Sequence, residues 1–145
     1  MQHTREDVVA AARAWIGTPY HHQASTPVAG CDCLGLVRGV FRALYGCEAE
    51  DVPPYSRDWA EASGLETMLG AARRHLIEIP AAEAGPGDVL VFRFKQGTLA
   101  KHAAILATAT SMIHATETAA VAEVPLSDWG RRRIAGAFSF PSMVS

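Results

Sequence analysis

The chain has 145 residues, a length typical of one domain that buries its own core. Hydrophobic residues make up 49% and charged residues 19%, which is the composition of a folded globular protein and excludes a disordered chain. The net charge of −2, with no basic run longer than Arg131-Arg132-Arg133, argues against nucleic acid as a partner. No apolar stretch approaches the roughly 20 residues of a membrane span, so none is expected.

The N-terminal segment and the cysteines indicate where the chain is made. Arg5, Glu6 and Asp7 stand where a secretory signal peptide needs an apolar run. The chain has three cysteines, an odd number, and Cys31 and Cys33 are too close in sequence to pair comfortably. We therefore expect synthesis in the cytoplasm, without a signal peptide and with reduced thiols.

A first helix is expected near the N-terminus. Thr4 is a suitable N-cap, and Asp7, three residues later, completes a variant of the capping box. Apolar residues follow at helical spacing as far as Ile16, and Gly17 then ends the helix. Residues 18–30 are predicted to form a loop.

Two further helices are expected before residue 80. The second covers about residues 33–45, where an apolar stripe recurs at helical spacing, and Gly46 ends it. Residues 47–63 are predicted to be irregular. A third helix is predicted over 65–76 from the spacing of its leucines and Met68.

The apolar period changes to that of strands after the turn signal at 84–88. Five strands are predicted, of which the last named is the weakest: 89–94, 102–108, 111–116, 134–140 and 120–126. Helices come first and strands later. This order predicts an α+β fold in which N-terminal helices pack on a C-terminal antiparallel β-sheet.

Cys33 stands at the predicted start of the second helix. Asp32 is a good N-cap residue, so Cys33 is the first helical residue, where unpaired N–H groups and the helix dipole favour an anion. A thiolate would be stabilised there, and the thiolate is the nucleophilic form of cysteine. Gly35, in the first turn, suggests that a substrate or a packed strand approaches the backbone closely. The alternative is that Cys33 is a small buried hydrophobic residue.

A cysteine nucleophile needs a histidine base, and His102 and His114 both lie in predicted strands. If residues 108–110 form the loop of a hairpin, residue 104 faces His114, and His102 is diagonal to it on the same face. His114 could then orient the ring of His102. A shift of one residue would put the two rings on opposite faces.

A metal site is the alternative reading of these residues. Cys31, Cys33, His102 and His114 could form a Cys₂His₂ zinc set. The spacing of both pairs departs from the usual zinc motifs, however. We therefore predict no metal and no cofactor.

Five sequence blocks occur in the order seen in NlpC-type cell-wall peptidases, which are papain-like cysteine enzymes. They are "GTPY" (17–20), "DCLGLV" (32–37), "PGDVLVF" (86–92), "KHAAIL" (101–106) and "MIHA" (112–115). The chain resembles this family over residues 17–115. The resemblance implies one NlpC-type peptidase domain over residues 1–145, with a papain-like fold.

The resemblance also implies roles for individual residues. Cys33 would be the nucleophile, His102 the base and His114 the third, polar member of a triad, while Tyr20 and Asp32 would line the substrate cleft. Asp32 could meet a free substrate amine where it is not consumed as a helix cap. Family members cut stem peptides of peptidoglycan, often between D-glutamate and a diamino acid.

Three longer stretches resemble the branch of the family carried by phages and gene transfer agents: "GTPYHHQAS", "DCLGLVRGVFRALYG" and "PPYSRDWAEA". This likeness implies phage-like tail or baseplate proteins as partners, and a particle that carries the enzyme to the periplasm or cell wall. The alternative is a tail structural or assembly component whose hydrolase site is weak or vestigial.

Two positions depart from the commoner family pattern. Leu34 replaces the serine that usually follows the nucleophile, and His22-Gln23-Ala24 replaces an aromatic-Gly-Gly sequence. Both positions are expected to lie beside the cleft. We therefore predict that they alter substrate preference while the catalytic set stays intact.

Overall fold

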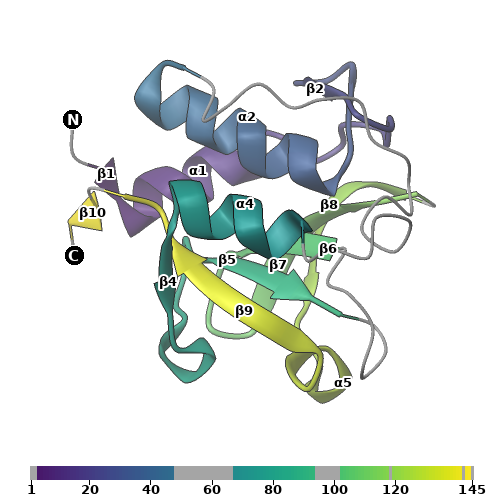
Figure 1. Cartoon of the computed structure of the whole chain (residues 1–145). Coiled ribbons are helices and arrows are strands. Elements are labelled where there is room, and N and C mark those ends of the chain that lie inside the picture. The colour runs from purple at the N-terminus through teal and green to yellow at the C-terminus, as the bar shows by residue number, and fades with distance from the viewer. Residues whose placement is uncertain (1–2, 48–66, 94–101, 118, 142, 145) are drawn as a thin grey trace.

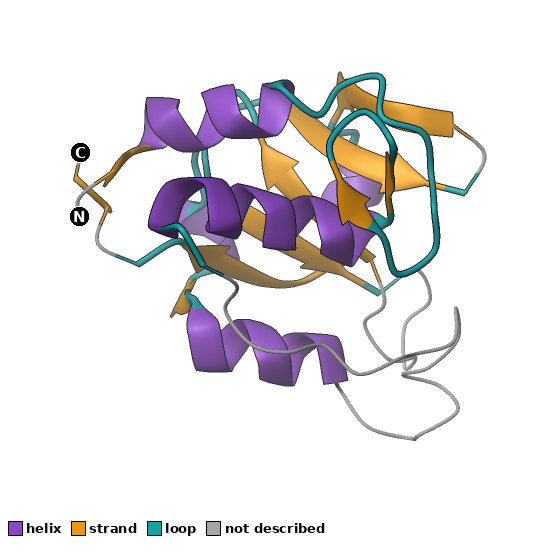
Figure 2. Ribbon diagram, turned by 90° about the horizontal axis from the view of Figure 1, so that it is seen from above, coloured by secondary structure: helices purple, strands orange, loops and turns teal. Residues whose placement is uncertain are grey.

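The computed structural model describes residues 3–47, 67–93, 102–117, 119–141 and 143–144. Three helices, α1 (Arg5–Arg13), α2 (Cys33–Tyr45) and α4 (Thr67–His75), cover one face of a β-sheet (Figures 1 and 2). The predicted α+β class, with N-terminal helices packed on an antiparallel sheet, is confirmed. None of the helices in these ranges is long and apolar enough to cross a membrane.

The main sheet has six strands in the order β4-β9-β5-β6-β7-β8, and each neighbouring pair is antiparallel. The strands are β4 (Ile77–Ile79), β5 (Val89–Phe92), β6 (His102–Leu106), β7 (Ser111–Thr116), β8 (Ala119–Pro125) and β9 (Ile134–Ser139). All five predicted strands are present. The sequence did not predict β4, a short edge strand with Glu78 at its centre.

Several shorter elements were also not predicted. They are β1 (His3–Thr4), β2 (Ser25–Thr26), β3 (Gly30–Cys31), η1 (Ala81–Glu83), α5 (Asp128–Arg131) and β10 (Met143–Val144). β1 pairs with β10 and so brings the first and last described residues together (Figure 1), while β2 and β3 form a hairpin inside the predicted loop. Each element is shorter than the window over which periodicity can be read.

The start of α1 agrees with the sequence, but its end does not. The Asp7 N–H donates to Thr4 Oγ1 at 3.1 Å and the Thr4 N–H to Asp7 Oδ2 at 2.9 Å, so the capping box is confirmed. The helix ends at Arg13 and continues as a tighter turn, in which the Ile16 N–H donates to the Arg13 carbonyl. This turn leaves Ile16 47% exposed, and its predicted place on the apolar face is wrong.

Both ends of α2 are as predicted, and Gly46 ends it with a left-handed backbone, φ +78°. α4 is shorter than its prediction, because Leu76 follows its last residue. Parts of three predictions lie outside the described residues: Leu65 of the third helix, the irregular segment after Cys47, and the end of the strand beyond Arg93.

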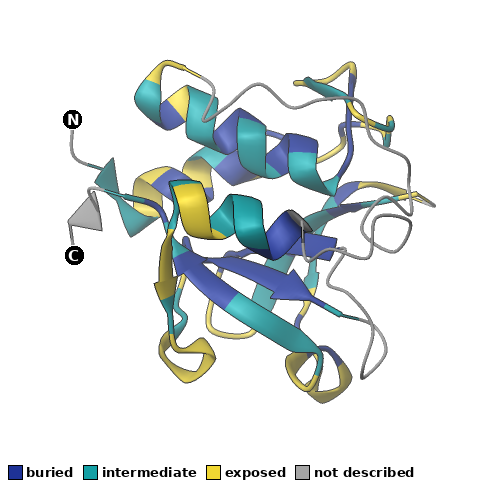
Figure 3. Ribbon diagram, in the orientation of Figure 1, coloured by how far each residue is buried: buried dark blue, intermediate teal, exposed yellow. Residues whose placement is uncertain are grey.

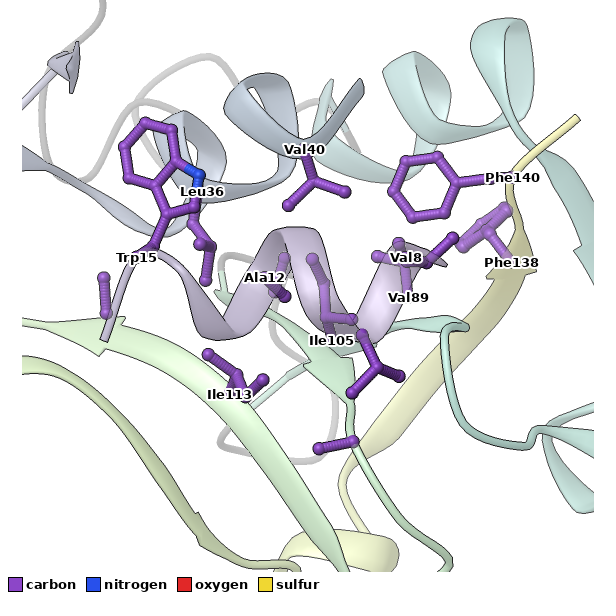
Figure 4. Close-up of a cluster of buried hydrophobic side chains, with 14 of the residues drawn as sticks. Val8, Ala12, Trp15, Leu36, Val40, Val89, Ile105, Ile113, Phe138 and Phe140 are labelled. Atoms are coloured by element: carbon purple, nitrogen blue, oxygen red, sulfur yellow. The ribbon is translucent and has the colours of Figure 1, made fainter. Parts of the chain in front are cut away.

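The main core lies between the helices and the sheet, where Figure 3 shows the most deeply buried ribbon. Figure 4 labels ten of its members: Val8, Ala12, Trp15, Leu36, Val40, Val89, Ile105, Ile113, Phe138 and Phe140. A second apolar cluster covers the opposite face of the sheet and includes Leu90, Ala104 and Leu106. Side chains alternate along a strand, so His102 shares the second face with Ala104.

Gly39 allows α2 to pack against the end of α1. A Cβ atom at Gly39 would lie 2.1 Å from Cζ2 of the Trp15 indole, and Trp15 is only 3% exposed. The indole is rigid and enclosed by the core, so it cannot move aside cheaply.

We predict that Gly39→Ala destabilises the fold by about 1–3 kcal/mol, since overpacking outweighs the gain of roughly 1 kcal/mol in helix propensity. Gly70→Ala in α4 is the matched control, because among the described residues a Cβ there meets only the end of the Arg74 side chain, at 3.5 Å. That control should leave stability unchanged or raise it slightly. Urea denaturation of both variants tests this, and equal effects would contradict the packing argument.

Candidate active site

The start of α2 is held by the carboxylate of Asp32. The Gly35 N–H donates to Oδ1 at 2.7 Å, which confirms the predicted N-cap, and the Gln23 N–H donates to Oδ2 at 2.8 Å. Asp32 is 3% exposed. One buried carboxylate therefore fixes both the helix start and the loop that precedes it.

Gly35 lets this loop lie directly on the helix. A Cβ at Gly35 would stand 1.9 Å from the carbonyl oxygen of Ala24, and the Asp32 N–H donates to that same oxygen at 3.3 Å. The close approach predicted at Gly35 is thus made by the loop backbone. Gln23, beside it, has a left-handed backbone with φ +66°, which its bond to Asp32 helps to hold.

Cys33 is the first residue of α2 and is partly exposed. Burial raises the pKa of its thiol to about 12, although the backbone N–H groups of Ala103, Leu34 and Cys33 itself act to lower it. The resting form is therefore the thiol, and not the thiolate that the helix start alone predicts. The N–H of Ala103 also shows that the sulfur lies at the beginning of β6.

The two histidines meet across the β6–β7 hairpin. Ile105 pairs with Ile113 and Leu106 with Met112, and this register places Ala104 opposite His114. The predicted register is confirmed. His102 is consequently diagonal to His114 on one face, and its Nε2 lies 3.0 Å from His114 Nδ1.

Both imidazoles are held in their neutral form. Burial, and to a smaller extent the neighbouring His114, lower the pKa of His102 to about 3. Burial also lowers the pKa of His114. At neutral pH the pair is uncharged, so one ring can donate a hydrogen to the other.

A cavity of approximately 560 Å³ joins these groups. Tyr20, Cys33, His102 and His114 all line it. The histidines project from the face of the sheet opposite the helices, and the Cys33 sulfur lies beside the Ala103 N–H, where β6 begins. The arrangement places a thiol, a neutral base and an orienting imidazole in one cleft, as nucleophilic attack on a carbonyl requires.

Other predicted residues lie elsewhere. Asp32 is not among the described residues that line the cavity, and its contact with substrate stays a prediction. Leu34 lines a separate apolar groove between α2 and α4, and Gln23 and Ala24 belong to the loop fixed to Asp32. The two departures from the family pattern therefore do not form the wall of this cavity.

The remaining cysteines stand apart from the cavity. Cys31 is fully buried in β3, where burial raises its thiol pKa to about 11, and Cys47 is exposed. Within the described ranges no three His, Cys, Asp or Glu side chains gather closely enough to hold a metal ion.

The apolar wall of the cavity was not predicted from the sequence. It includes Phe92, Met112, Val124, Leu126 and Trp129. Trp129 lies in α5, a helix of four residues whose N-cap Ser127 accepts from the Gly130 N–H. The Ser-Asp-Trp-Gly sequence is a capping signal that could have located this turn, but nothing in it placed the turn beside His114.

The chain belongs to the NlpC/P60 family, whose sequence profile matches residues 17–135. A curated relative is the gamma-DL-glutamyl hydrolase of Bacillus subtilis (strain 168), 31% identical over 137 residues, which are 94% of this chain and 29% of that protein. The chain thus spans less than a third of the relative's length.

Solved structures share the fold. The NlpC/p60 domain of the peptidoglycan hydrolase SagA superposes with a TM-score of 0.70 and 22% identity, covering 95% of this chain and all of that domain. An NlpC/P60 family protein from Bacillus cereus ATCC 10987 gives 0.71 and 20%, covering 95% of this chain and 40% of that one. The predicted papain-like architecture is confirmed.

The depressed pKa of His102 predicts how stability depends on pH. Between pH 6.5 and about 3 the unfolded chain protonates this histidine and the folded chain does not, so stability falls as pH decreases through that window. The contribution is at most about 1.4 kcal/mol per pH unit. Urea denaturation from pH 4 to 7 should therefore show a flatter dependence for His102→Gln than for the parent, and parallel curves would contradict a buried neutral ring.

We predict that Asp32→Asn lowers the stability of the fold. An asparagine offers one acceptor oxygen, so its amide would face one of the two backbone N–H groups donor to donor. An unsatisfied buried donor costs about 1–3 kcal/mol. Asp7→Asn is the matched control, because Asp7 accepts the Thr4 N–H at the surface and a single oxygen suffices. Thermal unfolding should show a clear loss for Asp32→Asn and little change for Asp7→Asn; the reverse order would disprove the double-acceptor role.

Proposed function

We propose that this chain is a cysteine peptidase that hydrolyses amide bonds in peptidoglycan stem peptides, between D-glutamate and a diamino acid. The observation that carries the proposal is the cavity shared by Cys33 and the hydrogen-bonded pair of His102 and His114. The bond assignment is supported by a relative named as a gamma-DL-glutamyl hydrolase, and the wall substrate by a structural neighbour described as a peptidoglycan hydrolase.

His114 sets the tautomer of His102 in this mechanism. The two nitrogens His102 Nε2 and His114 Nδ1 lie 3.0 Å apart, and we assign the hydrogen to His102 Nε2, which then donates to His114 Nδ1. Nδ1 of His102 is then the basic nitrogen, and we assign to it the thiol proton of Cys33. Because the same Nε2–H bond persists when His102 becomes charged, the ring keeps its orientation throughout the reaction.

The reaction proceeds by acyl transfer. The Cys33 sulfur attacks the amide carbonyl carbon while its proton passes to His102. The imidazolium then gives that proton to the leaving amine, the C–N bond breaks, and a thioester remains. Water, deprotonated by His102, hydrolyses the thioester to a carboxylic acid and restores the thiol. These steps need no cofactor.

The oxyanion of the tetrahedral intermediate requires hydrogen-bond donors. We assign this role to the Cys33 backbone N–H, which lies at the start of α2 and has no partner within the helix, with help from the Tyr20 hydroxyl. Tyr20 and Cys33 both line the cavity, and both pack against the main core.

We further propose that the chain is of the branch carried by phages and gene transfer agents. The proposal rests on the three resembling stretches, of which "PPYSRDWAEA" lies outside the described residues. A tail or baseplate would then carry the enzyme from the cytoplasm in which it is made to the peptidoglycan of the periplasm or cell wall.

The peptidase proposal predicts that Cys33→Ala lowers the rate of amine release from purified peptidoglycan by at least about a thousandfold. Cys47→Ala, which removes an exposed thiol outside the cavity, is the control and should retain full activity. The released fragments, identified by mass spectrometry, give the bond that is cut. Equal release by Cys33→Ala and the parent would reject the mechanism, and no release by the parent would favour a structural tail component with a vestigial site.

A further inference from the structure

A second cavity, of approximately 380 Å³, is lined by Arg93, Arg132, Arg133 and Ile134. Three guanidinium-bearing residues thus surround one concavity, and no Asp or Glu is among the described residues that line it. The chain as a whole carries a net charge of −2. The positive charge is therefore local to this cavity and suits an anionic ligand.

The sheet holds this arginine cavity in place. Arg93 directly follows β5, and Arg132 and Arg133 lie between α5 and β9. β5 and β9 are antiparallel neighbours, and the Arg93 N–H donates to the Arg133 carbonyl at 2.9 Å. The cavity is built on the ends of paired strands, which position side chains more firmly than a long loop does.

The arginine cavity adjoins the catalytic cavity. The Arg133 guanidinium carbon lies 3.7 Å from the centre of the Trp129 ring, and Trp129 lines the catalytic cavity while Arg133 lines the arginine cavity. The same relation occurs at the end of β5: its last residue, Phe92, lines the catalytic cavity, and Arg93, which follows it, lines the arginine cavity. The stacked pair of Trp129 and Arg133 therefore separates two neighbouring cavities.

The position of the arginine cavity indicates which part of a substrate it meets. α5 and the arginines that follow it lie at the side of the sheet away from α2, whose first residue is Cys33 (Figure 1). A group bound there is remote from the carbonyl that Cys33 attacks. Among anions, a carboxylate fits the planar guanidinium fork in a bidentate manner.

We propose that the arginine cavity binds the C-terminal carboxylate of the stem peptide, beyond the bond that is cut. This inference rests on the proposed function. A cross-link to a second stem converts that carboxylate into an amide and removes its charge. The subsite would therefore make the enzyme prefer stems that are not cross-linked through their C-terminal residue.

The direct test is isothermal titration of the Cys33→Ala protein, which prevents turnover, with two peptides. One is L-Ala–γ-D-Glu–L-Lys–D-Ala with a free C-terminal carboxylate, and the other is its C-terminal amide. The free acid should bind roughly tenfold to a hundredfold more tightly, the range of a charge-assisted hydrogen bond. Equal affinities for the two peptides would overturn the subsite, as would failure to bind either.

Arg132→Gln, added to Cys33→Ala, should reduce the affinity for the acid to about the affinity for the neutral amide. Arg131→Gln is the matched control. It removes the same charge one residue away, but its side chain donates to the Ala109 carbonyl and does not line the arginine cavity. The control should keep the preference for the acid, and thermal unfolding verifies that both variants fold. Loss of the preference in both would indicate general charge attraction and overturn the proposal.

Turnover by the parent enzyme separates this inference from the proposed function. Cleavage of both peptides with equal kcat/KM would reject the subsite and leave the peptidase intact. An acid preference in binding, without cleavage of either peptide by the parent, would reject the proposed peptidase and retain the anion site.

Discussion

Two hydrogen bonds, donated by two backbone N–H groups to the Asp32 carboxylate, are the constraint on which the site depends. One oxygen fixes the first turn of α2 and the other fixes the loop that carries Gln23. Cys33 follows Asp32 directly, so the position of its sulfur against the Ala103 N–H is inherited from this anchor. Gly35 makes the arrangement possible, because any side chain there would push the Ala24 carbonyl away from the helix.

Burial decides the charge state of the reacting groups. It raises the pKa of the Cys33 thiol and lowers that of His102, so both groups favour their neutral forms before substrate binds. Burial also lowers the pKa of His114, which favours the neutral form of that ring. A carboxylate in its place would stabilise a resting imidazolium, whereas an imidazole orients the base without adding a charge. Proton transfer from sulfur to nitrogen is then coupled to attack on the carbonyl in the mechanism proposed above.

The sequence predicts best where several local signals agree. α2 has an N-cap, a 13-residue apolar pattern and a glycine stop, and both its ends are as expected. The β6–β7 register followed from alternation and a short loop, which together placed His102 diagonal to His114 on one face of the sheet. The arginine cavity and Trp129 could not be predicted, because α5 is too short for periodicity and its place depends on tertiary packing. The raised thiol pKa was missed for a related reason: burial is not visible in a capping motif.

The alternation of side chains along β6 separates residues that stabilise the core from residues that face the cavity side of the sheet. Ala103 and Ile105 point into the core under the helices, while His102, Ala104 and Leu106 face the other side of the sheet. The cavity wall can therefore vary with little disturbance of the helix–sheet core. The proposed nucleophile, Cys33, is the exception, since the helix layer carries it, yet the proposed mechanism requires it to meet histidines on the far face. It can do so only where a strand begins and the sheet no longer stands between them, which is why the sulfur lies at the N-terminal end of β6.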